Sequence, residues 1–291
     1  MYNSREVIMR SIDEIRPSPI AGYWYSANPK VLRDEIQSYL NKANLPSING
    51  EVIGLVAPHA GYRYSGQTAA YSFKTVLGES YDLVVLLSPF HQYHPATILC
   101  SAHDYYQTPL GKIKVDQEIT NLLINSIVTK HGLDAVKIAN DEEHSLEIEL
   151  PFLQCVLDGD FDLLPIMVRS IEPNLAQMIA NSLIDVIKGK KVLIVSSTDL
   201  SHFYPKALAE KYDQEMLSQI KTFSVQNVYQ TESKGEGFAC GLGAVMIGIA
   251  TSYLLGADKV EILHHSTSGD VTGDFSSVVG YGSVVFLRSH L

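Results

Sequence analysis

Short apolar runs, each of a length typical of a buried β-strand, alternate along this chain with segments whose apolar residues recur at helical spacing. The first such unit runs from Ile53 to Gly66 and reads IGLVAPHAGYRYSG: an apolar run, a polar loop after Pro58, and the beginning of a helix. Further strands are expected at 82–87, 161–168, 191–195, 260–263 and 277–287. This alternation predicts an α/β fold around a central sheet that is mostly parallel or mixed.

Helices are expected between these strands, and two of them have well-marked ends. Asn28 and Pro29 are typical of a helix start, and Asp116 and Gly132 are typical of the start and the end of another helix. The apolar residues expected to face inward are Leu32, Ile36, Tyr39 and Leu40; Ala69, Ala70, Phe73, Val76 and Leu77; Ile119, Leu122, Leu123 and Ile127; and Leu175, Ile179, Leu183 and Ile187. The stretch 264–274, rich in Ser, Thr, Gly and Asp, is expected to be a loop.

Length and charge limit the classes of protein to consider. The chain of 291 residues can bury a full core, and we expect a single domain over 1–291. A net charge of -10 argues against nucleic-acid or anionic-membrane partners, which need clustered Lys and Arg. The three cysteines lie far apart without CxxC spacing, so we expect a reducing, cytoplasmic setting without disulfides. No apolar run approaches the ~20 residues that span a bilayer, and 1–10 lacks the apolar core of a signal peptide.

Three of the expected strands end in a histidine. His59 follows the strand in APH, His91 in SPFH and His202 in SSTDLSH, where Asp199 is a near neighbour. One such histidine is more often a packed core residue than a ligand. Because ligands bind beyond the carboxyl ends of strands in open α/β sheets, three in corresponding places are expected to meet in one site.

Cys240 is expected at the start of a helix rich in small residues within 238–257. A helix N-terminus stabilises a thiolate, which suits a metal ligand or a reactive thiol, whereas a buried small hydrophobe is the alternative. Histidines with a cysteine or carboxylate are typical ligands of iron, copper or zinc. The motifs of P-loop, dinucleotide-binding and GxSxG hydrolase proteins are missing, but a Cys240–histidine nucleophile pair stays open.

The acidic stretch from Asp141 to Leu153 reads DEEHSLEIELPFL. Its start is interpreted as a solvated helix N-terminus, where carboxylates are favoured by the helix dipole. His144 and Glu147 lie three residues apart and would share one helix face. Trp24, the single tryptophan, is predicted to be a packing anchor.

In this sequence the ordered blocks AGYWY, APHAGYRYSG, SPFH, TPLG, DEEHSLEIELPF, SSTDLSH, ACG and DVTGD resemble the Memo family, also catalogued as protein B of the AmmeMemoRadiSam system. The resemblance covers nearly the whole chain. The family is similar in fold to class III, LigB-like, non-haem iron extradiol dioxygenases. The resemblance therefore implies one three-layer α/β/α domain with a site in a central cleft.

The same resemblance implies a set of site residues. His59, His91 and Cys240 match the family's metal ligands, and Asp199 and His202 match the neighbouring polar pair. His202 sits where the dioxygenases have an acid/base histidine, whereas Cys240 replaces their carboxylate ligand. A thiolate favours softer or more thiophilic ions. Cu(I) and Zn are such ions, whereas iron is the metal of the similar dioxygenases. We expect iron or copper as the metal, with zinc as a further option.

Two functions are compatible with these residues. The first is a metal-dependent, dioxygenase-like oxidoreductase acting on a small molecule, with His202 as acid/base and Asp199 orienting it or binding the metal. The second is a non-catalytic binding protein that holds a peptide or phosphotyrosine-type ligand in the same cleft, as linked to animal members of the family. Arg63, Tyr64 and His144 are candidate ligand-binding residues for that cleft. The resemblance also implies association with radical-SAM system proteins.

Overall fold

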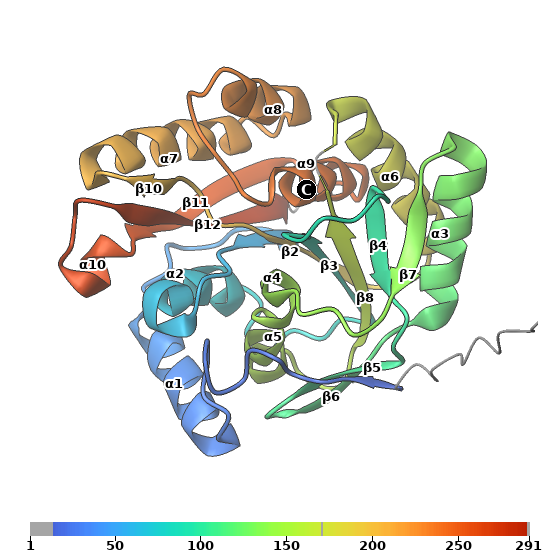
Figure 1. The fold of residues 1–291 in the computed structure, drawn as a ribbon, viewed down its shortest axis with the longest axis horizontal. Helices are drawn as coiled ribbons and strands as arrows, with labels where there is room; N and C mark the ends of the chain where they lie inside the picture. Colours follow the sequence, from blue (N-terminus) through green and yellow to red (C-terminus); the bar gives the residue numbers. More distant parts are fainter. Residues whose placement is uncertain (1–13, 170, 290–291) are drawn as a thin grey trace, which may run out of the picture.

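The computed structural model describes residues 14–169 and 171–289, so the expectation for 1–10 lies outside the described residues. A central mixed sheet lies between two layers of helices (Figure 1). In the described part of the chain this sheet has nine strands: β2 (Glu51–Ala57), β3 (Leu83–Pro89), β4 (Ile98–Ser101), β7 (Ala135–Ile138), β8 (Asp162–Val168), β9 (Val192–Ser197), β10 (His202–Tyr204), β11 (Lys259–Thr267) and β12 (Val278–Arg288). A smaller sheet is formed by β1 (Ile15–Arg16), β5 (Tyr105–Thr108) and β6 (Gly111–Lys114).

The strand order of the large sheet is β10-β12-β2-β9-β3-β8-β4-β7, and β11 pairs with the other side of β12. The four central strands β2, β9, β3 and β8 run parallel, whereas β12 and β4 are antiparallel to their neighbours β2 and β8. The sheet is therefore mixed, as predicted, with a parallel centre. Because parallel strands end at the same edge, the loops after β2, β9 and β3 lie next to one another.

Each face of the sheet is covered by its own group of helices. One group is α1 (Pro29–Lys42), α2 (Tyr62–Lys74) and α5 (Leu150–Val156); the other is α3 (Gln117–His131), α6 (Pro173–Val186), α7 (Lys206–Lys221), α8 (Val225–Ser233) and α9 (Leu242–Leu254). Successive strand residues point to opposite faces, so Val84 and Leu86 pack in the first core and Val85 and Leu87 in the second. The predicted three-layer α/β/α architecture is confirmed. Within the described residues, every helix is too short or too polar to cross a membrane.

The predicted helix ends are also confirmed. Asn28 caps α1 by accepting from the backbone N–H groups of Lys30 and Val31, and Asp116 caps α3 in the same way. Gly132 ends α3 in the left-handed conformation, with φ at 65°. These caps form through hydrogen bonds between residues close in sequence, so they can be predicted from the sequence alone.

Several local predictions were wrong. Leu77 and Leu122 were expected to face inward, but they are 51% and 49% exposed. Leu77 lies beyond the last residue of α2, where the helical periodicity no longer applies. The expected loop 264–274 instead begins inside β11 and contains the short helix α10 (Gly269–Thr272). Helices α7 and α8 and the small sheet were not predicted.

Candidate metal centre

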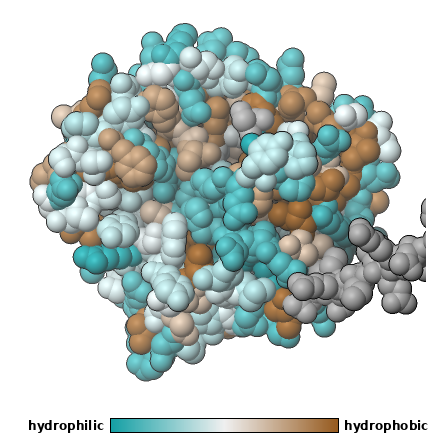
Figure 2. Space-filling view, in the orientation of Figure 1, coloured by the Kyte–Doolittle hydropathy of each residue, from teal (hydrophilic) through white to brown (hydrophobic). Residues whose placement is uncertain are grey.

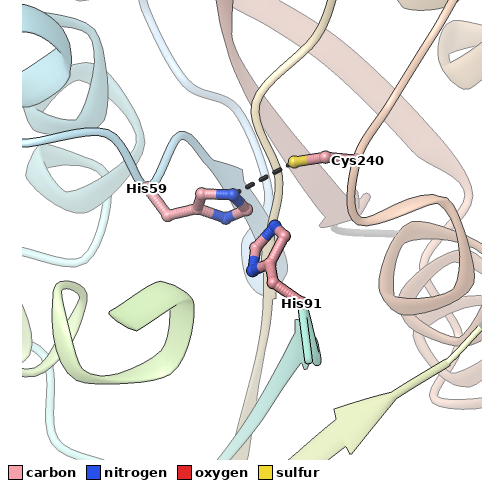
Figure 3. A group of neighbouring side chains, drawn as sticks. All are labelled: His59, His91 and Cys240. Carbon is pink, nitrogen blue, oxygen red and sulfur yellow. Dashed lines mark hydrogen bonds between the residues drawn. The ribbon is translucent and has the colours of Figure 1, made fainter. Parts of the chain in front are cut away.

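Three potential ligand side chains converge at the carboxyl edge of the parallel strands. His59 follows β2, His91 follows β3, and Cys240 precedes α9 (Figure 3). One nitrogen from each imidazole and the Cys240 Sγ all lie within 4.8 Å of one another. The His59 Nε2 and Cys240 Sγ atoms are 3.0 Å apart. The structure thus brings together the three residues that the sequence indicated as ligands.

The donor atoms suit a thiophilic transition metal. In a tetrahedral site with ordinary metal–nitrogen and metal–sulfur bonds, the nitrogen and sulfur ligands lie about 3.5 Å apart. The His59 Nε2 to Cys240 Sγ distance of 3.0 Å is that of a hydrogen bond, and a small outward shift of either side chain is enough to admit an ion. Two imidazoles and a thiolate leave at least one coordination position open.

His59 is buried, being 2% exposed, and the group that contacts its ring nitrogen Nδ1 is a neutral hydroxyl. Its Nδ1 lies 2.9 Å from Ser197 Oγ, and that hydroxyl lies 2.7 Å from Glu149 Oε1. The backbone N–H of His59 donates to Asp199 Oδ1 at 2.8 Å. Burial lowers the pKa of His59 well below its ordinary value, so the ring is neutral. With the Nδ1 proton on the Ser197 side, the Nε2 lone pair is directed at Cys240.

His91 is held by a carboxylate instead. Glu143 accepts from the His91 backbone N–H at 2.7 Å and approaches its Nδ1 at 2.9 Å. His144 Nδ1 lies 3.3 Å from the same Glu143 oxygen, and its ring stacks on His91 with centroids 4.8 Å apart. Burial raises the pKa of Glu143, but the hydrogen bonds and charge of His91 outweigh it and bring the pKa to about 2. Glu143 is therefore a permanent anion that orients both rings.

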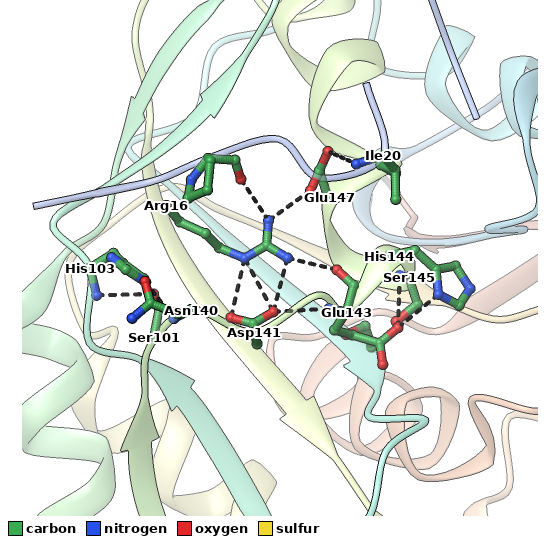
Figure 4. A network of polar contacts seen from close by, with 12 residues as sticks. Arg16, Ile20, Ser101, His103, Asn140, Asp141, Glu143, His144, Ser145 and Glu147 are labelled. Atoms are coloured by element: carbon green, nitrogen blue, oxygen red, sulfur yellow. Dashed lines mark hydrogen bonds and ion pairs between the residues drawn. The ribbon is translucent and has the colours of Figure 1, made fainter. Parts of the chain in front are cut away.

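A buried charge network holds the Glu143 turn in place (Figure 4). Arg16, which is 1% exposed, pairs with Asp141 at 2.9 Å and Glu147 at 2.7 Å, and it donates to the Glu143 backbone carbonyl at 2.8 Å. Glu147 Oε1 also accepts from the hydroxyl of Tyr25 at 2.7 Å. The interpretation of this acidic stretch as solvated was wrong. The side chains of Asp141 and Glu147 are buried because one arginine, distant in sequence, neutralises them, whereas Glu142 is exposed.

Asp199 and Cys240 are joined through the backbone. The Asp199 N–H donates to Cys240 Sγ at 3.2 Å, while its carboxylate accepts the N–H groups of His59 and Ala60. Burial raises the pKa of Asp199 to about 7, although those two N–H groups lower it. Burial and the Asp199 charge raise the pKa of the Cys240 thiol, contrary to the expected helix-dipole effect. Metal binding would therefore displace a proton from Cys240.

His202 lies beside this cluster on β10, half-buried, and lines a cavity together with Cys240. Its Nδ1 is 2.9 Å from the carbonyl oxygen of Leu200, so Nδ1 carries the proton of the neutral ring. Burial lowers the pKa of His202. The remaining nitrogen, Nε2, is then an unprotonated base at neutral pH.

The other candidate residues lie outside the three-residue cluster. Trp24 is partly buried, as expected of an anchor, and its ring lies 4.3 Å from that of His144. Tyr64 lines a separate cavity near β12. Arg63 is exposed, with its guanidinium 5.7 Å from the Tyr64 ring centroid. Hydrophilic side chains gather in the middle of this face, with hydrophobic ones to either side (Figure 2).

Sequence reasoning missed the residues that hold the ligands. Ser197 is the last residue of β9, and Glu149 directly precedes α5. Glu143 precedes the short helix α4 (His144–Glu147), and Arg16 belongs to β1. The run of acidic residues was the available signal. Carboxylates between apolar positions are costly to bury without a partner, so the run indicates that a cationic partner lies elsewhere in the chain.

The fold and the converging ligands define an α/β/α protein with a candidate His/His/Cys metal centre. The family model described as Memo-like protein matches residues 16–285, and the chain belongs to this Memo family. MEMO1 family proteins from Nitrosopumilus maritimus and Methanococcoides burtonii are 32% and 34% identical to it, over 94% and 93% of this chain and 100% and 99% of theirs. A MEMO1 family protein from Methanopyrus kandleri is 32% identical over 94% of this chain and 99% of its own. Among solved structures, an uncharacterized protein from Escherichia coli K12 matches 81% of this chain and 100% of its own, at 9% identity and a TM-score of 0.45.

Proposed function

We propose that this Memo-family protein binds one iron or copper ion, with zinc as the third option, through His59, His91 and Cys240. We further propose that it acts there as a metal-dependent oxidoreductase on a small substrate. The observation that carries the proposal is the convergence of three ligand atoms within 4.8 Å, each from a different segment. Support comes from the groups behind them, Ser197 and Glu143, which hold both rings as carboxylates and hydroxyls do in metal sites.

In this mechanism a bound iron or copper ion would supply Lewis acidity and one-electron chemistry. The protein's own residues supply orientation and proton transfer. Asp199 positions His59 through its backbone N–H, and Glu143 positions His91. His202 faces the cavity that Cys240 also lines, with Nε2 available to take a proton from a bound substrate.

The alternative function, a binding protein for phosphotyrosine-type ligands, has less support. Such a ligand needs at least one arginine aimed at its phosphate. Arg63 lies over the Tyr64 ring and is exposed. The cavity that Cys240 lines contains the carboxylate of Glu232, and the separate cavity that Tyr64 lines contains that of Asp274. A cytoplasmic location and association with radical-SAM system proteins stay predictions.

The test is metal content after anaerobic purification, measured by elemental analysis. The parent protein should hold about one equivalent of iron or copper, and His59→Ala and Cys240→Ala should lose it. Cys155→Ala is the matched control, because Cys155 is a partly exposed thiol on α5. It should retain the metal. Absence of metal from the parent, even after reconstitution with Fe(II), Cu(I) or Zn(II), would contradict the proposal.

A further inference from the structure

A cavity of about 290 Å³ opens directly beside the candidate metal centre. This volume is at the small end of the range for ligand pockets, ~300 Å³ and upward. Its walls include Leu200, His202, Tyr204, Glu232, Phe238 and Cys240. A ligand in this cavity would therefore meet His202 and Cys240 and, on other walls, aromatic rings and one carboxylate.

The aromatic wall is formed by two stacked rings. Tyr204 and Phe238 have ring centroids 5.7 Å apart and an interplanar angle of 18°. Tyr212 packs at a steep angle against both, with ring centroids 5.0 and 5.2 Å away, and is not among the lining residues of the cavity. Such rings offer a flat apolar surface to a planar ligand. Their electron-rich faces also attract organic cations.

Glu232 is the one charged side chain on the cavity wall. It lies in the last turn of α8, where the helix dipole adds further negative potential. Its Oε2 accepts from the backbone N–H of Ala239 at 2.9 Å, and among the described residues it forms no salt bridge. Burial raises the pKa of Glu232, because a buried carboxylate loses part of its hydration. A cationic ligand would supply the carboxylate with a partner of opposite charge.

A second cavity, lined in part by Val279 and Tyr281 of β12, has the same electrostatic character. It has a volume of about 360 Å³, and Tyr64, Asp274 and Tyr281 are among its lining residues. Neither cavity has a lysine or arginine among its described lining residues. Lys206, at the start of α7, is bound to Asp270 and Glu210. Both cavities therefore disfavour anionic ligands.

From these observations we propose that the cavity beside Cys240 binds a small organic amine. The ammonium group pairs with Glu232, and the planar or apolar body lies on Tyr204 and Phe238. The other end of the molecule then reaches His202 and Cys240. This inference rests on the proposed function, because it names the substrate class of the same site.

The probe for this test is 2-phenylethylamine, compared with 3-phenylpropionate and phenyl phosphate as matched anions. Binding is followed by isothermal titration calorimetry on the protein as purified, with its metal content determined on the same sample. The amine should bind saturably, and the two anions should bind at least tenfold more weakly. Glu232→Gln should weaken amine binding about tenfold or more, while the exposed neighbour Glu236→Gln should leave it unchanged.

The glutamine variant keeps an oxygen for the Ala239 N–H, and its thermal unfolding checks that the fold survives. Should that variant unfold, Phe238→Leu provides the second test, because it removes the ring and should also weaken amine binding. The proposal is overturned if either anion binds as tightly as the amine, if the amine does not bind, or if the tested variant binds the amine like Glu236→Gln. Amine binding in a preparation that cannot hold metal would support this cavity and refute only the proposed function.

Discussion

The two histidines of the candidate centre are held in opposite ways. His59 is 2% exposed, and a neutral group, the Ser197 hydroxyl, contacts its ring. The side chain of His91 is 38% exposed, and the Glu143 anion contacts its ring. Arg16 donates a hydrogen bond to the Glu143 backbone carbonyl and pairs with the buried carboxylates of Asp141 and Glu147. The Ser197 hydroxyl instead contacts Glu149.

The difference follows from where each ring lies. A ring inside the protein loses its freedom through packing, so weak neutral hydrogen bonds suffice to fix its tautomer. A ring at the surface competes with water for its partners, and a charge-assisted hydrogen bond is needed to hold it. We therefore expect the His91 side of the centre to depend on charge and the His59 side to depend on packing.

The largest effect should come from Arg16→Met. This change leaves the carboxylates of Asp141 and Glu147 buried without a cation, and it should lower the free energy of unfolding by about 3–5 kcal/mol. Urea titration measures the loss. The control is Arg33→Met, which removes an exposed arginine on α1 and should cost under about 1 kcal/mol. Equal losses of stability in the two variants would contradict a stabilising role of the Arg16 charge network.

Glu143→Gln should have the next largest effect, on metal affinity. The amide keeps an oxygen for the backbone N–H of His91 but lacks the charge that orients the ring. Metal affinity should fall about 10- to 100-fold in competition with a chelator. Glu142→Gln changes an exposed neighbour and should match the parent. An unchanged affinity in Glu143→Gln would show that the carboxylate does not hold the ligand.

Ser197→Ala should have the smallest effect. It removes the hydroxyl between His59 and Glu149, but packing still holds the ring, so affinity should fall only about tenfold. The same chelator competition measures it, with the exposed Ser218→Ala as control. A loss of metal affinity larger than that of Glu143→Gln would show that the His59 side depends on its hydrogen bond more than the His91 side does, contrary to the comparison.

The alternation of strands and helices and the place of two histidines at strand ends could be predicted because both follow from local rules, whereas the three-layer arrangement and the full candidate ligand set were implied by the resemblance to the Memo family. Alternating periodicity indicates strands and helices, and a residue just after a buried strand lies at the sheet edge. His59 and His91 could be placed on that basis. Helices α7 and α8 were missed because their apolar faces are short and carry many polar residues.

The supporting groups could not be predicted for a different reason. Arg16 contacts residues more than a hundred positions away, and no local pattern signals such a pairing. Ser197 reads as the end of a strand, and its role depends on Glu149, which comes from another element. The raised pKa of the Cys240 thiol likewise comes from burial by the whole fold and from the charge of Asp199. The expectation from the helix N-terminus alone, a lowered thiol pKa, was therefore wrong.

The most direct test of the central claim is the absorption spectrum of the protein reconstituted with Co(II) under anaerobic conditions. Ligation by His59, His91 and Cys240 predicts a thiolate-to-cobalt charge-transfer band in the near ultraviolet, and visible bands of low-symmetry four- or five-coordinate cobalt. The charge-transfer band should vanish in Cys240→Ala and persist in Cys155→Ala. A parent spectrum without that band, or one that survives in Cys240→Ala, would contradict the assignment of this cluster as the metal centre.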